Sequence, residues 1–393
     1  MGVYWSEKRK TWIAGYTDAA GARRIASFTL KKDADAYFVA VQSALKAGVH
    51  TAPSASPTVG EAAANWLAYV ELEGREASTV MQYRQHVELH IIPRIGHEKL
   101  ASLTTPGVNS FRDELLTALS RALARKVLTS LKSLLNDAQR RGHVAQNVAL
   151  AVRIGVDKRM KRKLKVGVDI PTPQEIGRIV QAVADRWRPI LVTAIFTGLR
   201  SSELRGLRWA DVDLKRGLIH VRQRADRFGA IGAPKSEAGE RAVPLGPFVL
   251  TLLREWKLKC PASDLGLVFP TGRGRIIRHE NIVRYALGPA QVAAGVTVPV
   301  MDERGKPAMD AKGRPIVAAK YPGLHALRHF YASWCINRRA DGGLELPAKV
   351  VQERLGHASI VITMDTYGHL FPVGDDGDEL AAAERALIGP HAI

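Results

Sequence analysis

The chain is 393 residues long, more than one compact domain usually holds, and 46% of its residues are hydrophobic, as in a globular protein with a buried core. Its 57 lysine and arginine residues against 38 acidic residues give a formal net charge of +19, which attracts polyanions, and nucleic acid is the commonest of these. The sequence has no apolar run long enough to span a bilayer and no signal-peptide pattern, and its only cysteines are Cys260 and Cys335. We therefore expect a cytoplasmic protein without a disulfide framework or a cysteine-based zinc site.

Residues 1–50 predict a small sheet followed by one helix. The segment TWIAGYTDAAGARRIASFTL contains two runs in which apolar and polar residues alternate, joined by the turn DAAG. In the following KKDADAYFVAVQSALKAG, apolar residues recur at helical spacing and the run ends at a glycine. We expect a three-stranded sheet plus a helix here, followed by a linker in VHTAPSASPTVG, which is rich in proline, serine, threonine and alanine.

Residues 58–155 predict a helical domain, because four successive segments carry apolar residues at helical spacing. These segments are VGEAAANWLAYVELEG, STVMQYRQHVELHIIPRIG, VNSFRDELLTAL and SRALARKVLTSLKSLLNDAQRRG. The next stretch, VDKRMKRKLKV, holds six lysine and arginine residues within residues 156–166. Such a run is either a solvated linker or a segment that lies along a phosphate backbone.

Residues 168–393 predict a mostly helical domain with a small sheet. Its first helix should follow Thr172, because Thr172 and Glu175 form a Thr-x-x-Glu capping box and Pro173 suits the first helical turn. Strand-like runs occur in GLIHVRQRADRFGAIGAPKSEAGERAVPL, and DERGKP and DAKGRP predict two successive turns in an insert over residues 298–317, to which the sequence assigns no function. The expected fold class is a multidomain, mainly α protein, with a small β-sheet-plus-helix N-terminal domain, a helical middle domain and a mixed, mostly α C-terminal domain.

The segment FTGLRSSELRGLRWADVD places an arginine at the start of a helix. Arg200 follows a Thr-Gly break, and beside the free backbone N–H groups of a helix N-terminus its guanidinium would suit a phosphate. Taken alone, Arg200 is more simply a surface arginine. Glu203 lies three residues later on the same helix face, where its carboxylate could pair with Arg200 and hold the guanidinium in place.

The segment PGLHALRHFYASW offers two histidines and an arginine on one helix. His325 and Arg328 share a face, and His325 and His329 are spaced i, i+4, as two metal ligands on a helix would be. However, Ala326 stands where a His-Glu-x-x-His zinc motif has its glutamate, and no carboxylate pair nearby completes a ligand set. We therefore expect no metal at these histidines.

Two further segments carry residues of catalytic type. In APKSEAGERAVPL, Lys235 lies on a turn near the end of a strand-like pair. A lysine on such a turn is normally solvated and has no specific role. It would have a catalytic role only if the turn folded over a site where a leaving group needs a proton. Near the C-terminus, GHASIVITMDTYGHL places His357 and Tyr367 ten residues apart, with His369 just after them. Either these are polar residues of a core, or Tyr367 is a phenol held ready to attack.

Taken in chain order, these residues resemble the tyrosine recombinase (phage integrase) family. TGLRSSEL, HALRH, LGHASIVIT and DTYGH are similar to its motif boxes, and the match covers most of the chain. Agreement at six ordered positions is improbable by chance, so the set is a strong signal although each part is weak. The resemblance implies six catalytic residues, with Glu203 in a supporting role: Arg200, Lys235, His325, Arg328, His357 and Tyr367.

The resemblance also implies a role for each of these side chains. Tyr367 would attack a DNA phosphodiester and form a covalent 3′-phosphotyrosine, while the two arginines stabilise the negative charge on the non-bridging oxygens. Lys235 would protonate the departing 5′-hydroxyl. A free phenol has a pKa of about 10 and needs a proton acceptor, and the residues alone leave open whether His325 or His357 serves. By resemblance, His325 is the acid–base partner and His357 a donor to the scissile phosphate.

For the rest of the chain, the resemblance implies domains and partners. Residues 1–50 would be an arm-type DNA-binding domain whose WIAGY and RRIASF strands lie in a major groove, or else a structural cap. Residues 58–155 would be a SAM-like core-binding domain, and residues 168–393 would be the catalytic domain. The implied partners are double-stranded DNA with core-type and arm-type sites, a homotetramer on that DNA, and an accessory DNA-bending or directionality factor, with no membrane. The amphipathic tail DELAAAERALIG would pack on a neighbouring protomer. The protein would act in the cytoplasm of a bacterial host cell, at the nucleoid.

The favoured function is a site-specific integrase of a phage or other mobile element. The covalent bond would store the energy of the broken linkage, so we expect no cofactor, neither ATP nor metal; the sequence has no P-loop and no carboxylate cluster of a two-metal nuclease. The alternatives are DNA relaxation like that of a type IB topoisomerase, a non-catalytic DNA-binding regulator and, more distantly, a metal-dependent nuclease. The arm-like N-terminus and the HALRH and LGHAS boxes favour the integrase, and a regulator would have no need to keep all six catalytic residues.

Overall fold

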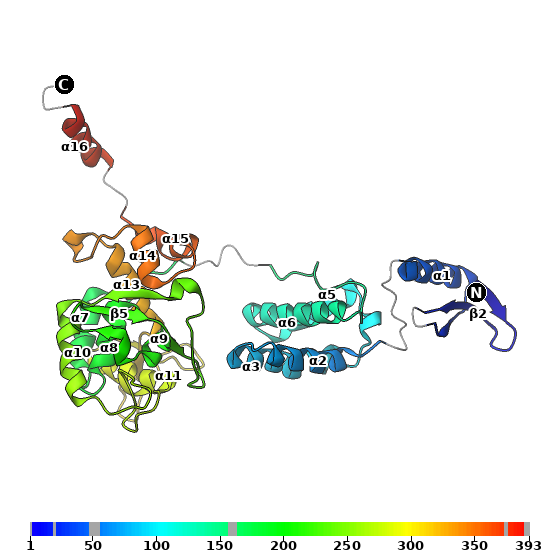
Figure 1. Cartoon of the computed structure of the whole chain (residues 1–393), viewed down its shortest axis with the longest axis horizontal. Helices are drawn as coiled ribbons and strands as arrows, with labels where there is room; N and C mark the ends of the chain where they lie inside the picture. The colour runs from blue at the N-terminus through cyan, green and yellow to red at the C-terminus, as the bar shows by residue number, and fades with distance from the viewer. Residues whose placement is uncertain (1, 19–20, 47–55, 156–162, 373–375, 389–393) are drawn as a thin grey trace. The chain divides into compact units, whose positions relative to one another are not determined.

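The computed structural model describes residues 2–18, 21–46, 56–155, 163–372 and 376–388. The chain forms two compact units, Met1–Lys158 and Arg159–Ile393. As expected, it is mainly helical, with small antiparallel sheets (Figure 1). Part of the predicted linker, 47–55, and most of the predicted basic run, 156–162, lie outside the described residues. The division of the first unit into two domains stays a prediction.

Three antiparallel strands and one helix occupy the N-terminal residues. The strand order is β1-β2-β3, and α1 packs on the sheet: β1 (Gly2–Ser6), β2 (Thr11–Thr17), β3 (Arg23–Phe28) and α1 (Lys31–Lys46). Tyr16 and Phe28 contact Tyr37 of α1, with ring centroids 6.3 and 5.2 Å apart. Because side chains alternate along a strand, the opposite face carries Tyr4 and Ile25, which are 51% and 52% exposed.

A helical bundle with its own apolar core follows. Its helices are α2 (Val59–Leu72), α3 (Ala77–His86), α4 (Ile92–Ile95), α5 (Thr105–Ala118) and α6 (Arg121–Arg140). Trp66, Phe111 and Leu131 are among the side chains buried between them. The helix predicted over residues 78–96 contains a π-turn at Val87–Ile91, because Pro93 has no N–H with which to continue the regular ladder.

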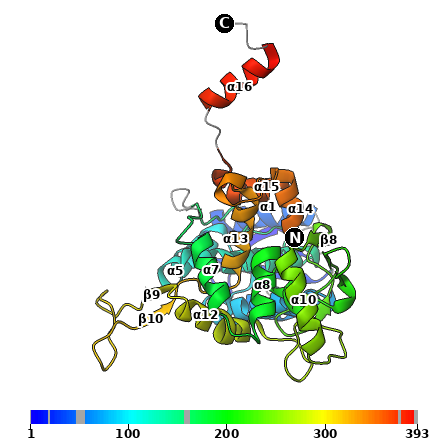
Figure 2. The same ribbon diagram turned by 90° about the vertical axis from the view of Figure 1, so that its left-hand side faces the viewer.

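The second unit is built around α8 (Arg188–Thr197), whose sequence RPILVTAIFT is apolar on nearly every side and is therefore buried. It packs against α10 (Pro247–Lys259) and α13 (His325–Ile336), and these helices lie side by side in Figure 2. The start of α7 (Pro173–Ala182) confirms the capping box predicted from the sequence, since Thr172 and Glu175 satisfy each other's backbone N–H.

The predicted strand-like segment, 217–245, forms two small sheets together with β4, which lies just before it. One has the order β4-β5-β8 and the other pairs β6 with β7: β4 (Val212–Asp213), β5 (Leu218–Val221), β6 (Arg224–Ala225), β7 (Ile231–Gly232) and β8 (Arg241–Pro244). Strand β8 also contacts α14 (Ala348–Leu355), although more than a hundred residues separate them in sequence. This contact positions the candidate site.

The insert forms a hairpin that extends beyond the helix before it. That helix comprises α11 (His279–Ile282), a π-turn (Val283–Leu287) and α12 (Gly288–Ala293), and the hairpin pairs β9 (Thr297–Pro299) with β10 (Val317–Ala319) (Figure 2). The two turns predicted in the insert are confirmed: the N–H of Gly305 donates to the carbonyl of Asp302, and that of Gly313 donates to the carbonyl of Asp310.

The C-terminal helices complete the second unit. They are α14, α15 (Ile360–Tyr367) and α16 (Asp376–Ile388). Helix α14 packs against α13 and α15, and a small core of Tyr331, Cys335, Val351, Leu355 and Tyr367 lies among them. Within the described part of the chain, no helix combines the length and apolarity that crossing a membrane requires.

Candidate active site

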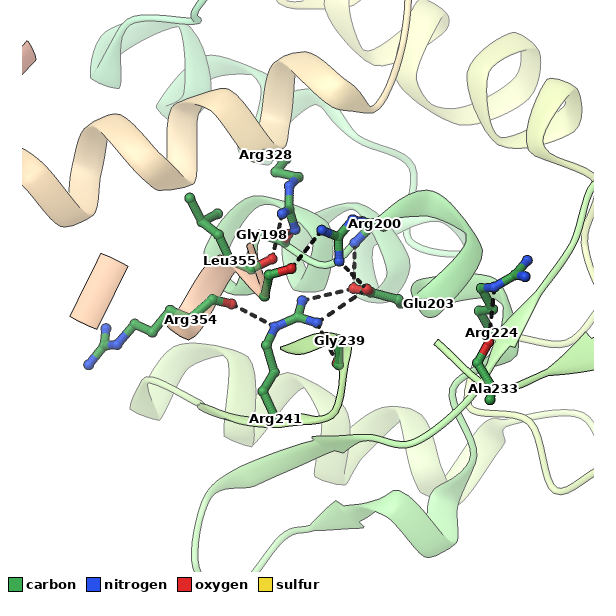
Figure 3. A network of polar contacts seen from close by, with 11 residues as sticks. Gly198, Arg200, Glu203, Arg224, Ala233, Gly239, Arg241, Arg328, Arg354 and Leu355 are labelled. Atoms are coloured by element: carbon green, nitrogen blue, oxygen red, sulfur yellow. Dashed lines mark hydrogen bonds and ion pairs between the residues drawn. The ribbon is translucent and has the colours of Figure 1, made fainter. Parts of the chain in front are cut away.

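Arg200 is held at the N-terminus of α9 (Ser201–Gly206), where it is the N-cap residue. Its Nη1 donates to Oε1 of Glu203 at 2.8 Å, and its backbone N–H donates to Oε2 of the same carboxylate at 2.9 Å. The ion pair predicted between these residues is therefore confirmed. Its Nη2 donates to the carbonyl of Gly356 at 2.8 Å, which links the start of α9 to the segment that carries His357 (Figure 3).

Glu203 has a second arginine partner, Arg241 at the start of β8. Nη2 of Arg241 donates to Oε2 at 2.8 Å and Nη1 donates to Oε1 at 3.2 Å, and the two side chains are only 6% and 3% exposed. Burial alone raises the pKa of Glu203, but its contacts with Arg241 and Arg200 outweigh burial and lower the pKa below its usual value. The carboxylate is thus charged and fixes both guanidiniums.

Arg241 connects three parts of the site. Besides Glu203, it reaches the carbonyl of Arg354 at the end of α14, through Nε at 2.8 Å, and the carbonyl of Gly239 in the β7–β8 loop, through Nη1 at 2.9 Å (Figure 3). Arg241 was not predicted from the sequence, because its partners Glu203 and Arg354 lie 38 and 113 residues away. The one available signal was an arginine that begins a strand-like run, RAVP.

Arg328 lies beside Arg200 and is 3% exposed. Its Nη1 donates to the carbonyl of Gly198 at 2.6 Å, and its Nη2 donates to the carbonyl of Leu355. Burial and the charge of Arg200 lower the pKa of Arg328 to about 10, so the guanidinium remains charged at neutral pH. The two arginines therefore bind the successive carbonyls of Leu355 and Gly356 and concentrate positive charge at one point.

Gly356 is expected to tolerate no side chain. It ends α14 with φ +63°, and a Cβ there would lie 2.8 Å from both the carbonyl oxygen of Ala238 and Nη1 of Arg241. Gly342 has φ +79° but open space around it, so Gly342→Ala controls for the backbone cost alone, about 1–2 kcal/mol. We expect Gly356→Ala to lower the free energy of unfolding, measured in urea, by clearly more than Gly342→Ala does. Equal losses would contradict this close packing.

His329 and His357 contact Tyr367, and His325 contacts His329. The rings of His325 and His329 meet edge to face with centroids 4.5 Å apart, and the ring of His357 stacks on that of Tyr367 at 6.4 Å and an interplanar angle of 4°. Nδ1 of His357 lies 2.9 Å from Oγ1 of the buried Thr363, which fixes the imidazole plane. The structure thus brings His325 and His357 to one place, together with His329, which the sequence suggested only as a metal ligand.

Tyr367 is 1% exposed, and its hydroxyl lies 2.7 Å from Nδ1 of His329. Burial raises the pKa of Tyr367 to about 12, against a smaller lowering by Arg328. The phenol is therefore protonated at neutral pH and must lose a proton when it attacks. Of the three nearby histidines, His329 is the one hydrogen-bonded to the phenol in the described part of the chain.

Acid is expected to destabilise this unit through its buried histidines. Burial and the neighbouring positive groups, Arg328 among them, lower the pKa of both His329 and His357 to about 4. The unfolded chain then binds protons first, so the free energy of unfolding falls as the pH drops from about 6.5 toward 4, by on the order of 2 kcal/mol per histidine after solvent screening. Urea unfolding at pH 7 and pH 5 should show a larger loss for wild type than for a His329→Asn, His357→Asn double variant. A loss of the same size in both would contradict the assignment.

Lys235 stands apart from these contacts. It is exposed in the loop between β7 and a short 3₁₀ turn (Glu237–Gly239). Within the described residues it takes part in none of the hydrogen bonds that join the two arginines and the three histidines. The link from Arg241 to Gly239 does tie this loop to the site, so Lys235 stays a predicted proton donor.

The arrangement suits a phosphate and a covalent step. Two fixed guanidiniums and neutral imidazoles surround a protonated phenol, so an anion is attracted and a nucleophile stands beside it. In the described ranges, no group of three or more histidine, cysteine, aspartate and glutamate side chains is placed to hold a metal ion.

Comparisons with known proteins show which family the chain resembles. The model of the phage integrase family matches residues 171–372. A tyrosine recombinase XerC-like protein of Caldanaerobacter subterraneus subsp. tengcongensis is 25% identical over an alignment of 342 residues, with 80% of each chain covered. A tyrosine recombinase XerC of Xylella fastidiosa is 32% identical over 238 residues, which make up 59% of this chain and 64% of that one.

Solved structures share the fold. The Tn1549 transposon integrase in complex with a circular intermediate DNA is 18% identical, with a TM-score of 0.60 and coverage of 84% of this chain and 100% of that one. The lambda integrase tetramer bound to a Holliday junction is also 18% identical, with a TM-score of 0.53 and coverage of 91% and 96%.

Proposed function

Because this chain belongs to the phage integrase family, we propose that it is a site-specific DNA recombinase that cuts and rejoins DNA through a covalent 3′-phosphotyrosine. It is an enzyme of the tyrosine recombinase type, with DNA strand breakage and rejoining as its reaction. One observation supports the proposal most directly. Arg200 and Arg328 bind successive backbone carbonyls at the end of α14, in the same site as the Tyr367 hydroxyl.

We propose a task for these residues in the reaction. Arg200 and Arg328 hold the scissile phosphate and stabilise the charge that develops on its non-bridging oxygens. Tyr367 attacks phosphorus, and Lys235 gives a proton to the departing 5′-oxygen. His357, whose ring stacks on that of Tyr367, donates to the phosphate, and the broken linkage is preserved in the new ester, so that neither ATP nor metal is required.

The recombinase is proposed to integrate a phage or other mobile element. Residues 2–46 support this assignment, because their sheet leaves one face open, and an antiparallel ribbon fits the major groove of DNA. Tyr4 and Ile25 on this face are about half exposed, and Arg23 lies on the same face. This sheet would bind arm-type sites, while residues 58–155 and 168–393 bind core-type sites.

Assembly on DNA is proposed to be tetrameric, as in the lambda integrase structure on a Holliday junction. Helix α16 would pack on a neighbouring copy of the chain, and a truncation after about Val373 that leaves assembly on DNA intact would refute this. An accessory DNA-bending or directionality factor completes the complex, which would act in the bacterial cytoplasm, at the nucleoid.

The covalent intermediate tests the function. Protein is mixed in EDTA with labelled DNA from the ends of its own element, nicked so that the cleaved strand escapes, and wild type is compared with Tyr367→Phe on denaturing gels. We expect a denaturant-stable labelled band in wild type alone, and recombinant products on intact sites. Relaxation of any supercoiled plasmid without recombinants would favour a topoisomerase, and tight binding without an adduct would favour a regulator.

A further inference from the structure

His329 lies one helical turn after His325 on α13, and its ring is hydrogen-bonded to the phenol hydroxyl. Its Nδ1 is 2.7 Å from the Tyr367 hydroxyl oxygen, and the two rings are 5.7 Å apart at an angle of 64°. Because the tyrosine is 1% exposed, this contact is shielded from water and holds the hydroxyl in one orientation.

The other two histidines are oriented differently. His357 presents its ring face to Tyr367, and its Nδ1 is engaged with Thr363. His325 touches His329 edge to face, a contact that fixes the plane of the His329 ring. His329 therefore has a supported position, and its Nδ1 is directed at the atom that forms the new bond.

Both partners are neutral before the reaction. Burial, His325 and Arg328 lower the pKa of His329 to about 4, and burial raises that of Tyr367 to about 12. A neutral imidazole keeps one nitrogen unprotonated, so the phenol O–H can donate to Nδ1 while Nε2 carries the ring proton. A bound phosphate would offset the charge of Arg328 and make the imidazole a better proton acceptor.

We propose that His329 is a catalytic residue that orients the Tyr367 hydroxyl and accepts its proton during strand cleavage. The O–H bond of Tyr367 breaks, its proton passes to Nδ1 of His329, and the phenolic oxygen bonds to phosphorus. The bond from phosphorus to the 5′-oxygen breaks, and that oxygen takes a proton from a separate donor, Lys235. In religation the imidazolium of His329 returns the proton to the phenolic oxygen as it leaves.

This role of His329 rests on the proposed function, and the test separates the two. Single-turnover adduct formation on nicked DNA is measured for wild type, His329→Asn and His329→Leu, with His220→Asn, a half-buried histidine on the central strand β5, as a matched control. Asparagine places an oxygen near the position of Nδ1 and so keeps an acceptor, but it cannot take up the proton. Thermal unfolding establishes that each variant is folded. If His329→Leu does not fold, the comparison of His329→Asn with wild type is sufficient for the test.

We expect adduct formation about 10²-fold slower for His329→Asn, slower still for His329→Leu, and unchanged for His220→Asn. A second DNA carries sulfur in place of the scissile 5′-oxygen, because a thiolate leaves without a proton. Lys235→Ala should recover on this DNA, whereas the His329 variants should stay slow. Recovery of the His329 variants would overturn the proposal, since it would place His329 on the leaving group.

A rate for folded His329→Asn within about threefold of wild type would overturn proton acceptance by His329. If His329→Leu were equally fast, the orienting role would fall as well. Either result, obtained with an active wild type, leaves the recombinase assignment standing. Absence of an adduct in wild type, by contrast, overturns the proposed function and this role together.

Discussion

Arg328→Lys is expected to slow strand cleavage about 10³-fold under single-turnover conditions while leaving a folded protein. The guanidinium of Arg328 spans the carbonyls of Gly198 and Leu355, and so it is held between the end of α8 and the end of α14. A lysine ammonium is a point charge that cannot reproduce this planar fork, so the charge would be retained but displaced from the phosphate. The measurement is adduct formation on nicked DNA in a rapid-quench apparatus.

The matched control is Arg254→Lys on α10. Nη2 of Arg254 also donates to a backbone carbonyl, that of Leu214 at 2.9 Å, but Arg254 is exposed and takes part in none of the hydrogen bonds described above for the arginine pair. It should leave the cleavage rate unchanged. If Arg328→Lys cleaved within about tenfold of wild type, positive charge alone would suffice and the fixed fork would not be a main source of catalysis.

Arg241→Met is expected to lower the free energy of unfolding by about 3 kcal/mol and to slow cleavage as well. The change leaves the carboxylate of Glu203, which is 3% exposed, with Arg200 as its remaining arginine partner. A buried charge that loses a partner is costly, because it has already lost its hydration. Arg241→Met also removes the hydrogen bonds to the carbonyls of Arg354 and Gly239, so the three parts of the site are no longer held together.

Adding Glu203→Gln separates the two effects. The double variant removes the buried charge pair, so its stability should return to within about 1 kcal/mol of wild type. Cleavage should remain slow, because Arg200 has lost the carboxylate that orients it. Urea unfolding and single-turnover cleavage of both singles and the double form the cycle. A double variant that recovers both stability and rate would show that the carboxylate does not position Arg200.

Local patterns predicted the helices well. The capping box of Thr172 and Glu175, the helical spacing of α2 to α6 and the turns of the insert depend on neighbouring residues, so sequence is enough to place them. The π-turn before Pro93 was not predicted, because a helix that continues past a proline has the same apolar spacing as a regular one.

The candidate site was predictable only in part. Ordered motif boxes located the arginines, His325, His357 and Tyr367, and the structure brings all of them together. They gave no indication of Arg241, whose role depends on the packing of β8 against α14. They also did not show that His329 rather than His325 meets the phenol, since the i, i+4 spacing places both on one face of the helix.

The proposed reaction depends above all on Tyr367 as the nucleophile, and mapping the covalent bond tests this assignment directly. Adduct made with labelled DNA is digested with nuclease and trypsin, and the labelled peptide is sequenced by mass spectrometry. Tryptic cleavage after Arg354 and Arg385 yields a peptide whose single tyrosine is Tyr367. We expect the nucleotide on that residue. A label on any other peptide, or on a serine or threonine of this one, would contradict the account.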